Sequence, residues 1–253
     1  MAEQTARVPR LVKVAMVASA VATVAALLGA ALLREGPAAS GGVPGGVQQP
    51  PASERAPASS PSAAPSLRCG SGPCVGVEAT TVGNTKVELL ADASGGFSRV
   101  RFDEGGDSGL NVHETLAISV GGKVQKGSLS CQAASRYQAC LVTFNQSDDG
   151  TKVGTLYLKP PSRPWVRVEA NYPSDQGVLQ LRDVNDDGIP EVLAVASACD
   201  GSGNFQACKR FVVQAINYEG SYIGCTAVVT KKELLPGWPN NLSPTRQQLK
   251  VCQ

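Results

Sequence analysis

The segment of residues 183–191, with the sequence DVNDDGIPE, constrains the fold of this chain more than any other feature. Its positions 1, 3, 5 and 9 carry carboxylate or amide side chains, which are Asp183, Asn185, Asp187 and Glu191. Position 6 is Gly188, which allows the backbone to double back so that these side chains converge. A hard cation such as Ca²⁺ requires a convergent set of oxygen ligands at about 2.3–2.6 Å. The segment therefore predicts a calcium-binding loop.

The residues on either side of this loop indicate strands rather than helices. An EF-hand or a dockerin loop places a carboxylate at position 12, but position 12 is Ala194 in this chain, which excludes both types. The apolar residues 192–195 follow the loop directly, as is typical of a buried strand. We therefore expect the loop to connect two strands of a sheet.

Residues 178–195 resemble the calcium loops of FG-GAP and VCBS repeats, which occur in integrin-like β-propellers. The shared pattern is an apolar strand, a DxDxDG-type loop with a carboxylate near position 9, and a second apolar strand. The resemblance implies that Asp183, Asn185, Asp187 and Glu191 bind Ca²⁺ through their side chains, and that Ile189 binds it through its carbonyl oxygen. It covers 18 of 253 residues and is much more specific for calcium than for the fold.

Two alternatives remain for this loop. Asp, Asn and Gly favour turns whether or not a metal is bound, so the segment is also compatible with a plain polar turn. If calcium binds, we expect it to stiffen the connection between two strands rather than to contact a ligand of the protein.

An uncharged run of 20 residues, 14–33, lies near the N-terminus and follows three basic residues. Crossing the hydrocarbon core of a membrane takes about 20 helical residues, whereas the apolar region of a cleaved signal has about 7–15. The run predicts a single transmembrane anchor, with residues 1–13 in the cytoplasm and the C-terminal part outside the cell. Cleavage and secretion are the alternative, because the small residues Ala38 and Ala39 follow the run.

The part of the chain after the apolar run divides into a linker and a domain. Residues 34–66 are dominated by Pro, Ala, Ser and Gly, which predicts an extended spacer. Residues 67–253 are long enough to form one well-buried domain. The net charge of +2 is too small to indicate a nucleic-acid partner.

All eight cysteines lie in the range 67–253. An even number of cysteines in a segment predicted to be outside the cell indicates four disulfides. Zinc is the competing interpretation, but no CxxC pair is present and His113 is the only histidine. The spacing favours bonds between neighbours in the sequence, namely Cys69 with Cys74, Cys131 with Cys140, Cys199 with Cys208, and Cys225 with Cys252.

Two ten-residue stretches, 131–140 and 199–208, share their cysteine spacing and an aromatic-Gln-Ala-Cys ending. The offset of 68 residues predicts two blade-like repeats, at about 84–149 and 150–219, although a chance similarity between β-rich segments is the alternative. The first repeat has no ligand residues at the positions that correspond to the loop, so we expect one calcium ion. A closed propeller has at least about four blades, so a sandwich or a partial propeller is expected.

Short β-rich runs bounded by turn residues recur along the domain, and only 243–250 is compatible with a short helix. The predicted fold is therefore all-β, with antiparallel sheets stapled by disulfides. The predicted strands are 86–91, 97–102, 112–120, 139–144, 153–158, 178–181, 192–196, 210–215 and 224–229.

These features favour a membrane-anchored extracellular binding or structural module, with a cell-wall polymer or a protein as its ligand. Exposed aromatic side chains would support this function, and the candidates are Trp165, Tyr172, Tyr222 and Trp238. The alternative is a secreted hydrolase that acts on a cell-surface polymer through a pair of carboxylates. The candidates for such a pair are Asp103, Glu104, Asp107, Glu114 and Asp175. A Ser-His-Asp triad would have to use His113, which is expected on a strand.

Overall fold

The computed structural model describes residues 67–105, 110–146, 150–199 and 207–252. The predicted cytoplasmic segment 1–13, the anchor 14–33 and the linker 34–66 lie outside these residues. Within them, no helix is long and apolar enough to cross a membrane. In the described part of the chain the regular elements are β-strands and three single 3₁₀ turns, Ile118–Val120, Lys232–Leu234 and Arg246–Gln248.

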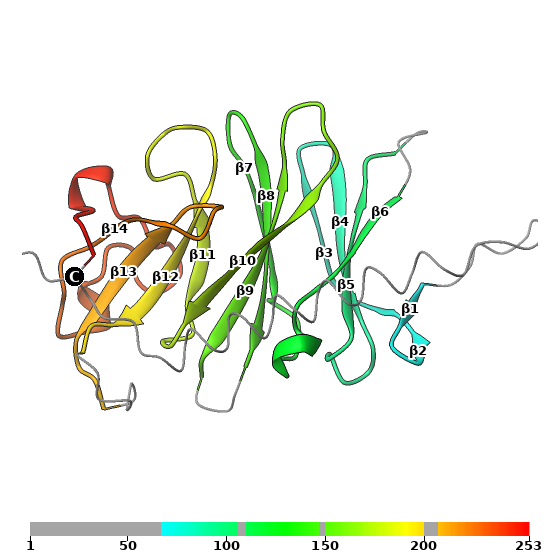
Figure 1. The fold of residues 1–253 in the computed structure, drawn as a ribbon, viewed down its shortest axis with the longest axis horizontal. Coiled ribbons are helices and arrows are strands. Elements are labelled where there is room, and N and C mark those ends of the chain that lie inside the picture. Colours follow the sequence, from blue (N-terminus) through cyan, green and yellow to red (C-terminus); the bar gives the residue numbers. More distant parts are fainter. Residues whose placement is uncertain (1–66, 106–109, 147–149, 200–206, 253) are drawn as a thin grey trace, which may run out of the picture. The chain divides into compact units, whose positions relative to one another are not determined.

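Three four-stranded antiparallel sheets follow one another along the chain, and each is a meander whose strands pair in chain order (Figure 1). The first sheet consists of β3 (Val75–Val82), β4 (Thr85–Ala91), β5 (Ser98–Asp103) and β6 (Leu110–Glu114). The second sheet consists of β7 (Leu129–Ala133), β8 (Gln138–Asn145), β9 (Lys152–Lys159) and β10 (Val166–Ser174). The third sheet consists of β11 (Leu179–Arg182), β12 (Glu191–Ser197), β13 (Phe211–Ile216) and β14 (Tyr222–Cys225). A small two-stranded sheet, β1 (Arg68–Cys69) and β2 (Gly72–Pro73), precedes them.

The prediction of an all-β fold with antiparallel sheets is confirmed, and so is the disulfide pairing. The four bonds join Cys69 to Cys74, Cys131 to Cys140, Cys199 to Cys208, and Cys225 to Cys252. Two predicted strands are too long. The run 112–120 leaves the sheet after Glu114, because the chain turns to place Ala117 in the core and then forms a 3₁₀ turn. In the run 224–229 the regular strand ends at Cys225, and Val229 then pairs with Phe211 of β13 in an isolated bridge.

The sheets divide the domain at positions other than those of the predicted repeats. The range 84–149 contains β4 to β8, and the range 150–219 contains β9 to β13, so each range covers parts of two sheets. The two similar cysteine pairs also differ in their setting. Cys131 and Cys140 lie opposite each other on β7 and β8, the first two strands of a meander, whereas Cys199 and Cys208 flank the connection between the second and third strands of another. A repeat at an offset of 68 stays a prediction from the sequence.

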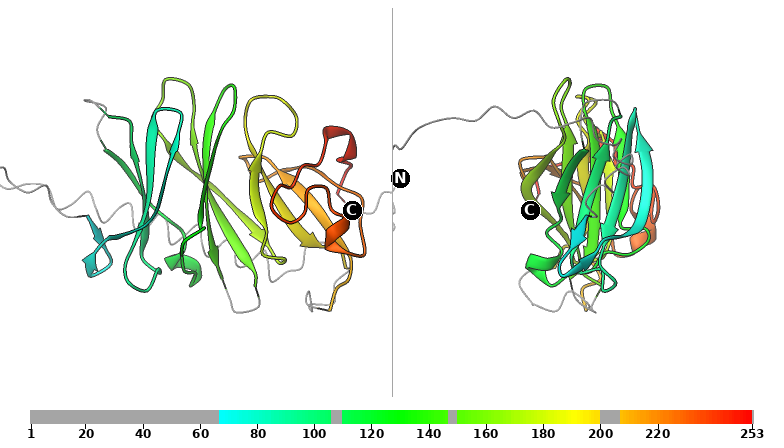
Figure 2. Two further views of the ribbon diagram at one scale, coloured as in Figure 1. Left: turned by 180° about the vertical axis from the view of Figure 1, so that it is seen from behind. Right: turned by 90° about the vertical axis from the view of Figure 1, so that its right-hand side faces the viewer.

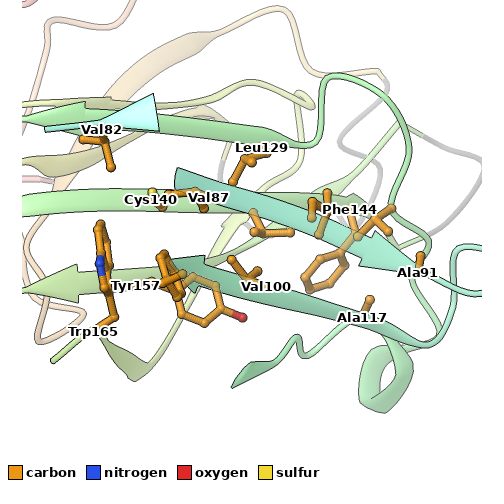
Figure 3. Close-up of a cluster of buried hydrophobic side chains, with 14 of the residues drawn as sticks. Val82, Val87, Ala91, Val100, Ala117, Leu129, Cys140, Phe144, Tyr157 and Trp165 are labelled. Carbon is orange, nitrogen blue, oxygen red and sulfur yellow. The ribbon is translucent and has the colours of Figure 1, made fainter. Parts of the chain in front are cut away.

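One hydrophobic core lies between the first and second sheets (Figure 3). Val87 and Val100 of the first sheet and Cys140 and Tyr157 of the second belong to it, and all four are buried. Trp165, which precedes β10, closes this core by stacking on Phe102, with their ring centroids 4.2 Å apart and their planes inclined by 13°. Its side chain is 1% exposed.

A second core lies between the second and third sheets. It contains Leu141 and Leu156 of the second sheet and Val192 and Ile216 of the third. Leu141 and its neighbour Val142 belong to different cores, because successive side chains of a strand point to opposite faces of the sheet. The second sheet is therefore covered on both faces, which explains why β8 is a continuous run of buried residues from Ala139 to Phe144 rather than an alternating pattern.

The outer faces of the first and third sheets differ in character. The outward face of the first sheet is polar, with ion pairs between Lys86 and Glu88 at 2.9 Å and between Arg99 and Glu114 at 2.7 Å. The far face of the third sheet is apolar, and the C-terminal segment runs over it (Figure 2). Leu235 and Leu242 of this segment belong to the core on that face.

Replacement of Trp165 tests how strongly the first core stabilises the domain. We expect Trp165→Ala to lower the free energy of unfolding by about 3–5 kcal/mol, because it removes a fully buried indole and leaves a cavity. Chemical unfolding followed by far-UV circular dichroism measures this change. Tyr222, which is 57% exposed, supplies the control, and Tyr222→Ala is expected to change the free energy by about 0.5 kcal/mol or less. Equal losses for both variants would contradict the central role of Trp165.

Candidate metal centre

The loop of residues 183–191 connects β11 to β12 at one end of the third sheet. Arg182 and Glu191 are paired across the two strands, so the ends of the loop are held together by the sheet. Asp186 and Gly188 both have positive φ angles, of 60° and 81°, and these two left-handed residues give the loop its tight curvature. The sequence predicted both the position of the loop and the two flanking strands.

The four predicted ligand side chains accept hydrogen bonds from backbone N–H groups of the loop. Asp183 Oδ2 accepts from Gly188 at 2.9 Å, and Glu191 Oε2 accepts from Val184 at 2.8 Å. Each of the two remaining side chains accepts a hydrogen bond from the N–H group two residues further along. Asn185 Oδ1 accepts from Asp187 at 3.0 Å, and Asp187 Oδ1 accepts from Ile189 at 2.8 Å. The loop is therefore organised around its own polar side chains.

Two observations indicate uncompensated negative charge inside the loop. The Oδ1 atom of Asp183 is buried and has no hydrogen-bond partner, which is unusual for a carboxylate oxygen. Glu191 is 3% exposed, and burial raises its pKa from an ordinary 4.5 to about 7, with further contributions from the nearby carboxylates of Asp187 and Asp183. A bound cation would give the unpaired oxygen a partner and offset the charge of all three carboxylates, so these residues fit calcium chemically.

The carboxylates nevertheless do not form a closed cluster. Among the described residues, no three His, Cys, Asp or Glu side chains are close enough together to hold a metal ion. The amide nitrogen of Asn185 donates to Asp187 Oδ2 at 3.0 Å, which occupies one of the oxygens that a cation would bind. Ile189 is held beside Asp187 through its N–H group. Binding of a cation would therefore require the side chains of the loop to move closer together.

The turn between β7 and β8 packs against this loop, a contact that the sequence did not predict. The carbonyl oxygen of Gly188 accepts hydrogen bonds from the N–H groups of Arg136 at 3.1 Å and Tyr137 at 3.0 Å. No local pattern connects the two segments, because they are about 50 residues apart and belong to different sheets.

A polar cleft with a volume of about 560 Å³ lies beside the loop and was also not predicted. It is lined by residues of β7 and β11, which are edge strands of the second and third sheets, and by the C-terminal segment. Arg182 donates to the side chain of Asn241 across this cleft at 3.2 Å. The lining combines a guanidinium group, amide side chains and the carboxylate of Asp183, so the cleft suits a polar ligand.

The carboxylates considered for a hydrolase have other partners. Asp103 and Glu114 lie on paired strands but four register positions apart, about 13 Å at the usual rise, which exceeds the 5–9.5 Å or so of a glycosidase pair. Glu104 pairs with Lys159 at 2.6 Å, and Asp175 accepts hydrogen bonds from the N–H group of Ser197. Asp107 lies outside the described residues.

The single histidine, His113, contacts the backbone beside the first core. His113 is half-buried on β6, and its Nε2 atom is 3.1 Å from the carbonyl oxygen of Trp165. Burial lowers the pKa of His113, so the imidazole is neutral near pH 7.

The four aromatic residues that were candidates for ligand contact divide into buried and exposed members. Trp165 and Tyr172 are buried in the two inner cores, and Trp238 packs against the far face of the third sheet. Tyr222 is exposed on the edge strand β14. Of these four side chains, only that of Tyr222 is largely free to contact a partner.

Comparisons of the chain with models of protein families, with curated proteins and with solved structures found no match. The fold and the loop together define the class of the protein, which is a disulfide-bonded all-β domain of three four-stranded antiparallel sheets with an acidic interstrand loop.

The raised pKa of Glu191 predicts how the stability of the calcium-free domain depends on pH. The folded domain binds this proton more tightly than the unfolded chain, because burial raises the pKa from 4.5 to about 7. The resulting stabilisation is complete below the ordinary pKa and is lost as the pH rises through about 7. We expect the melting temperature in excess chelator to fall between about pH 5 and about pH 8.

Glu191→Gln is the matched variant for this experiment, because it keeps an oxygen that can accept from Val184 and cannot titrate. Thermal unfolding of this variant in chelator should have a flatter pH dependence than that of the wild type. An identical pH dependence in both proteins would show that another group is responsible.

Proposed function

We propose that residues 67–253 form a calcium-stabilised β domain that acts outside the cell as a binding or structural module. The observation that carries this proposal is the buried, unpartnered Oδ1 atom of Asp183 inside a loop that also contains the buried carboxylate of Glu191. Calcium bound by Asp183, Asn185, Asp187, Ile189 and Glu191 would supply the missing positive charge. Its role would be to fix the connection between β11 and β12.

The extracellular location is supported by the state of the cysteines. All eight are paired in four disulfides, and no free thiol is present among the described residues. Such a density of disulfides is typical of oxidising compartments. In our proposal the apolar run 14–33 anchors the chain in the membrane and 34–66 spaces the domain from it. Secretion after cleavage of the run is the alternative.

The arrangement of the sheets supports a partial propeller as the architecture of the module. Each sheet has the strand order of a propeller blade, and the first strands β3, β7 and β11 lie next to one another along the row. In propellers the first strands of the blades surround the centre of the molecule. The polar cleft between β7 and β11 is the proposed site for a cell-wall or protein ligand.

Calcium-dependent unfolding of two variants that each lose one negative charge from the same loop tests the proposed metal site. At a calcium concentration about 100 times the dissociation constant, binding stabilises the folded state by about 2.7 kcal/mol, which raises the melting temperature by about 5–10 °C for a domain of this size. We expect this rise for the wild type and for Asp186→Asn, because Asp186 is not a predicted ligand. Asp187→Asn should lose most of it.

The measurement is thermal unfolding of residues 67–253 with the disulfides intact, in millimolar calcium and in excess chelator. A melting temperature of the wild type that does not respond to calcium would make the loop a polar turn and would overturn the proposed metal site. Equal calcium responses of the two variants would leave Asp187 without a role as a ligand.

A further inference from the structure

The peptide groups on either side of Gly188 join the calcium loop of the third sheet to the turn between β7 and β8 of the second sheet. On one side, the N–H group of Gly188 donates to the predicted ligand Asp183 at 2.9 Å. On the other side, its carbonyl oxygen accepts from Arg136 and Tyr137. A displacement of the turn would therefore move the group that holds a ligand side chain in place.

The two segments are in close contact at this point. Gly188 is buried and has a φ angle of +81°. A Cβ atom at this position would lie 2.4 Å from Ser135 Oγ and 3.0 Å from the backbone nitrogen of Arg136. The space beside Gly188 is thus already filled by the turn, and the loop has no room to shift toward it.

The turn is itself held firmly. Cys131 and Cys140 form a disulfide directly across β7 and β8, and the N–H group of Ala134 donates to the carbonyl oxygen of Tyr137 at 2.9 Å to close the turn. Tyr137 also packs against the second core, which contains Val192 of the strand that follows the loop. The disulfide therefore restrains a segment that reaches the loop through two backbone hydrogen bonds and through one from the Arg136 side chain to the carbonyl oxygen of Asp187 at 3.5 Å.

We propose that the β7–β8 turn, residues Ala134–Tyr137, is a latch that positions the calcium loop and is fixed by the Cys131–Cys140 disulfide. Reduction of this disulfide loosens the loop, and a cation bound in the loop holds the second and third sheets together more tightly. If reduction weakens cation binding by some factor, a bound cation opposes reduction by the same factor, because a coupling free energy between two sites acts equally in both directions. The part of this inference that concerns the cation rests on the proposed function, whereas the mechanical part does not.

Amide hydrogen exchange in excess chelator tests the latch without any metal. We expect the amides of Val184, Gly188 and Ile189 to exchange about ten-fold faster or more in the double variant Cys131→Ala/Cys140→Ala than in the wild type. The matched control is Cys69→Ala/Cys74→Ala, which removes a disulfide before the first sheet. Exchange at these three amides should be unchanged in the control. Equal exchange in the wild type and the first double variant would overturn the latch.

The same proteins titrated with calcium separate the latch from the proposed function. If the wild type binds calcium, the first double variant should need about five-fold more calcium or more for half-saturation, whereas the control should not. Unchanged calcium affinity in the first double variant would overturn the coupling. If the wild type does not bind calcium, the proposed metal site fails, and the exchange experiment in chelator still decides whether the turn positions the loop.

A double-mutant cycle covers the case in which loss of the Cys131–Cys140 bond prevents folding. Gly188→Ala lowers the melting temperature through backbone strain and through the contact with Ser135 Oγ. In a Ser135→Gly background the strain is the same but the contact is absent, so the decrease should be smaller. The close contacts with Arg136 remain in both backgrounds. An equal decrease in both backgrounds would therefore overturn the contact at Ser135 as a means by which the turn restrains the loop.

Discussion

The burial of both faces of the second sheet is the constraint on which the rest of the domain depends. Leu141 and Val142 on β8 contribute to different cores, so the second sheet needs a partner on each side. The first and third sheets each bury one face against it, and their outer faces differ from each other. The first sheet carries ion pairs there, and the third is covered by C-terminal residues that the Cys225–Cys252 disulfide ties to β14. Loss of packing in the second sheet would therefore separate all three.

The edges of the sheets explain why the candidate binding features lie where they do. The inner edge strands β7 and β11 border the polar cleft, and the connection that leaves β11 forms the acidic loop. The β7–β8 turn contacts that loop through the carbonyl oxygen of Gly188. The cleft, the loop and the turn thus follow from one arrangement, in which the first strands of the second and third sheets lie next to each other.

The features that could be predicted from the sequence are those that local patterns determine. Turn residues and short apolar runs marked β4, β5, β8, β9, β12 and β13, and spacing alone identified the four disulfides. The short strands β1 and β2 were missed, as were three strands of the four-stranded sheets, β3, β7 and β10. These three are all edge strands, whose partly exposed faces carry polar residues such as Glu78 and Arg167. In the candidate site, the loop and its polar side chains were predicted. The contact with Arg136 was not, because it depends on how two sheets pack.

The different outer faces of the first and third sheets have a consequence for self-association. Sheets that stack face to face can in principle continue through neighbouring molecules, and repeat proteins prevent this with terminal units that have a polar outer face. In this domain the charged residues Lys86, Glu88 and Arg101 make the outer face of the first sheet polar. The segment that contains Leu235 and Leu242 covers the outer face of the third sheet. The stack is therefore limited by its two ends rather than by closure into a ring.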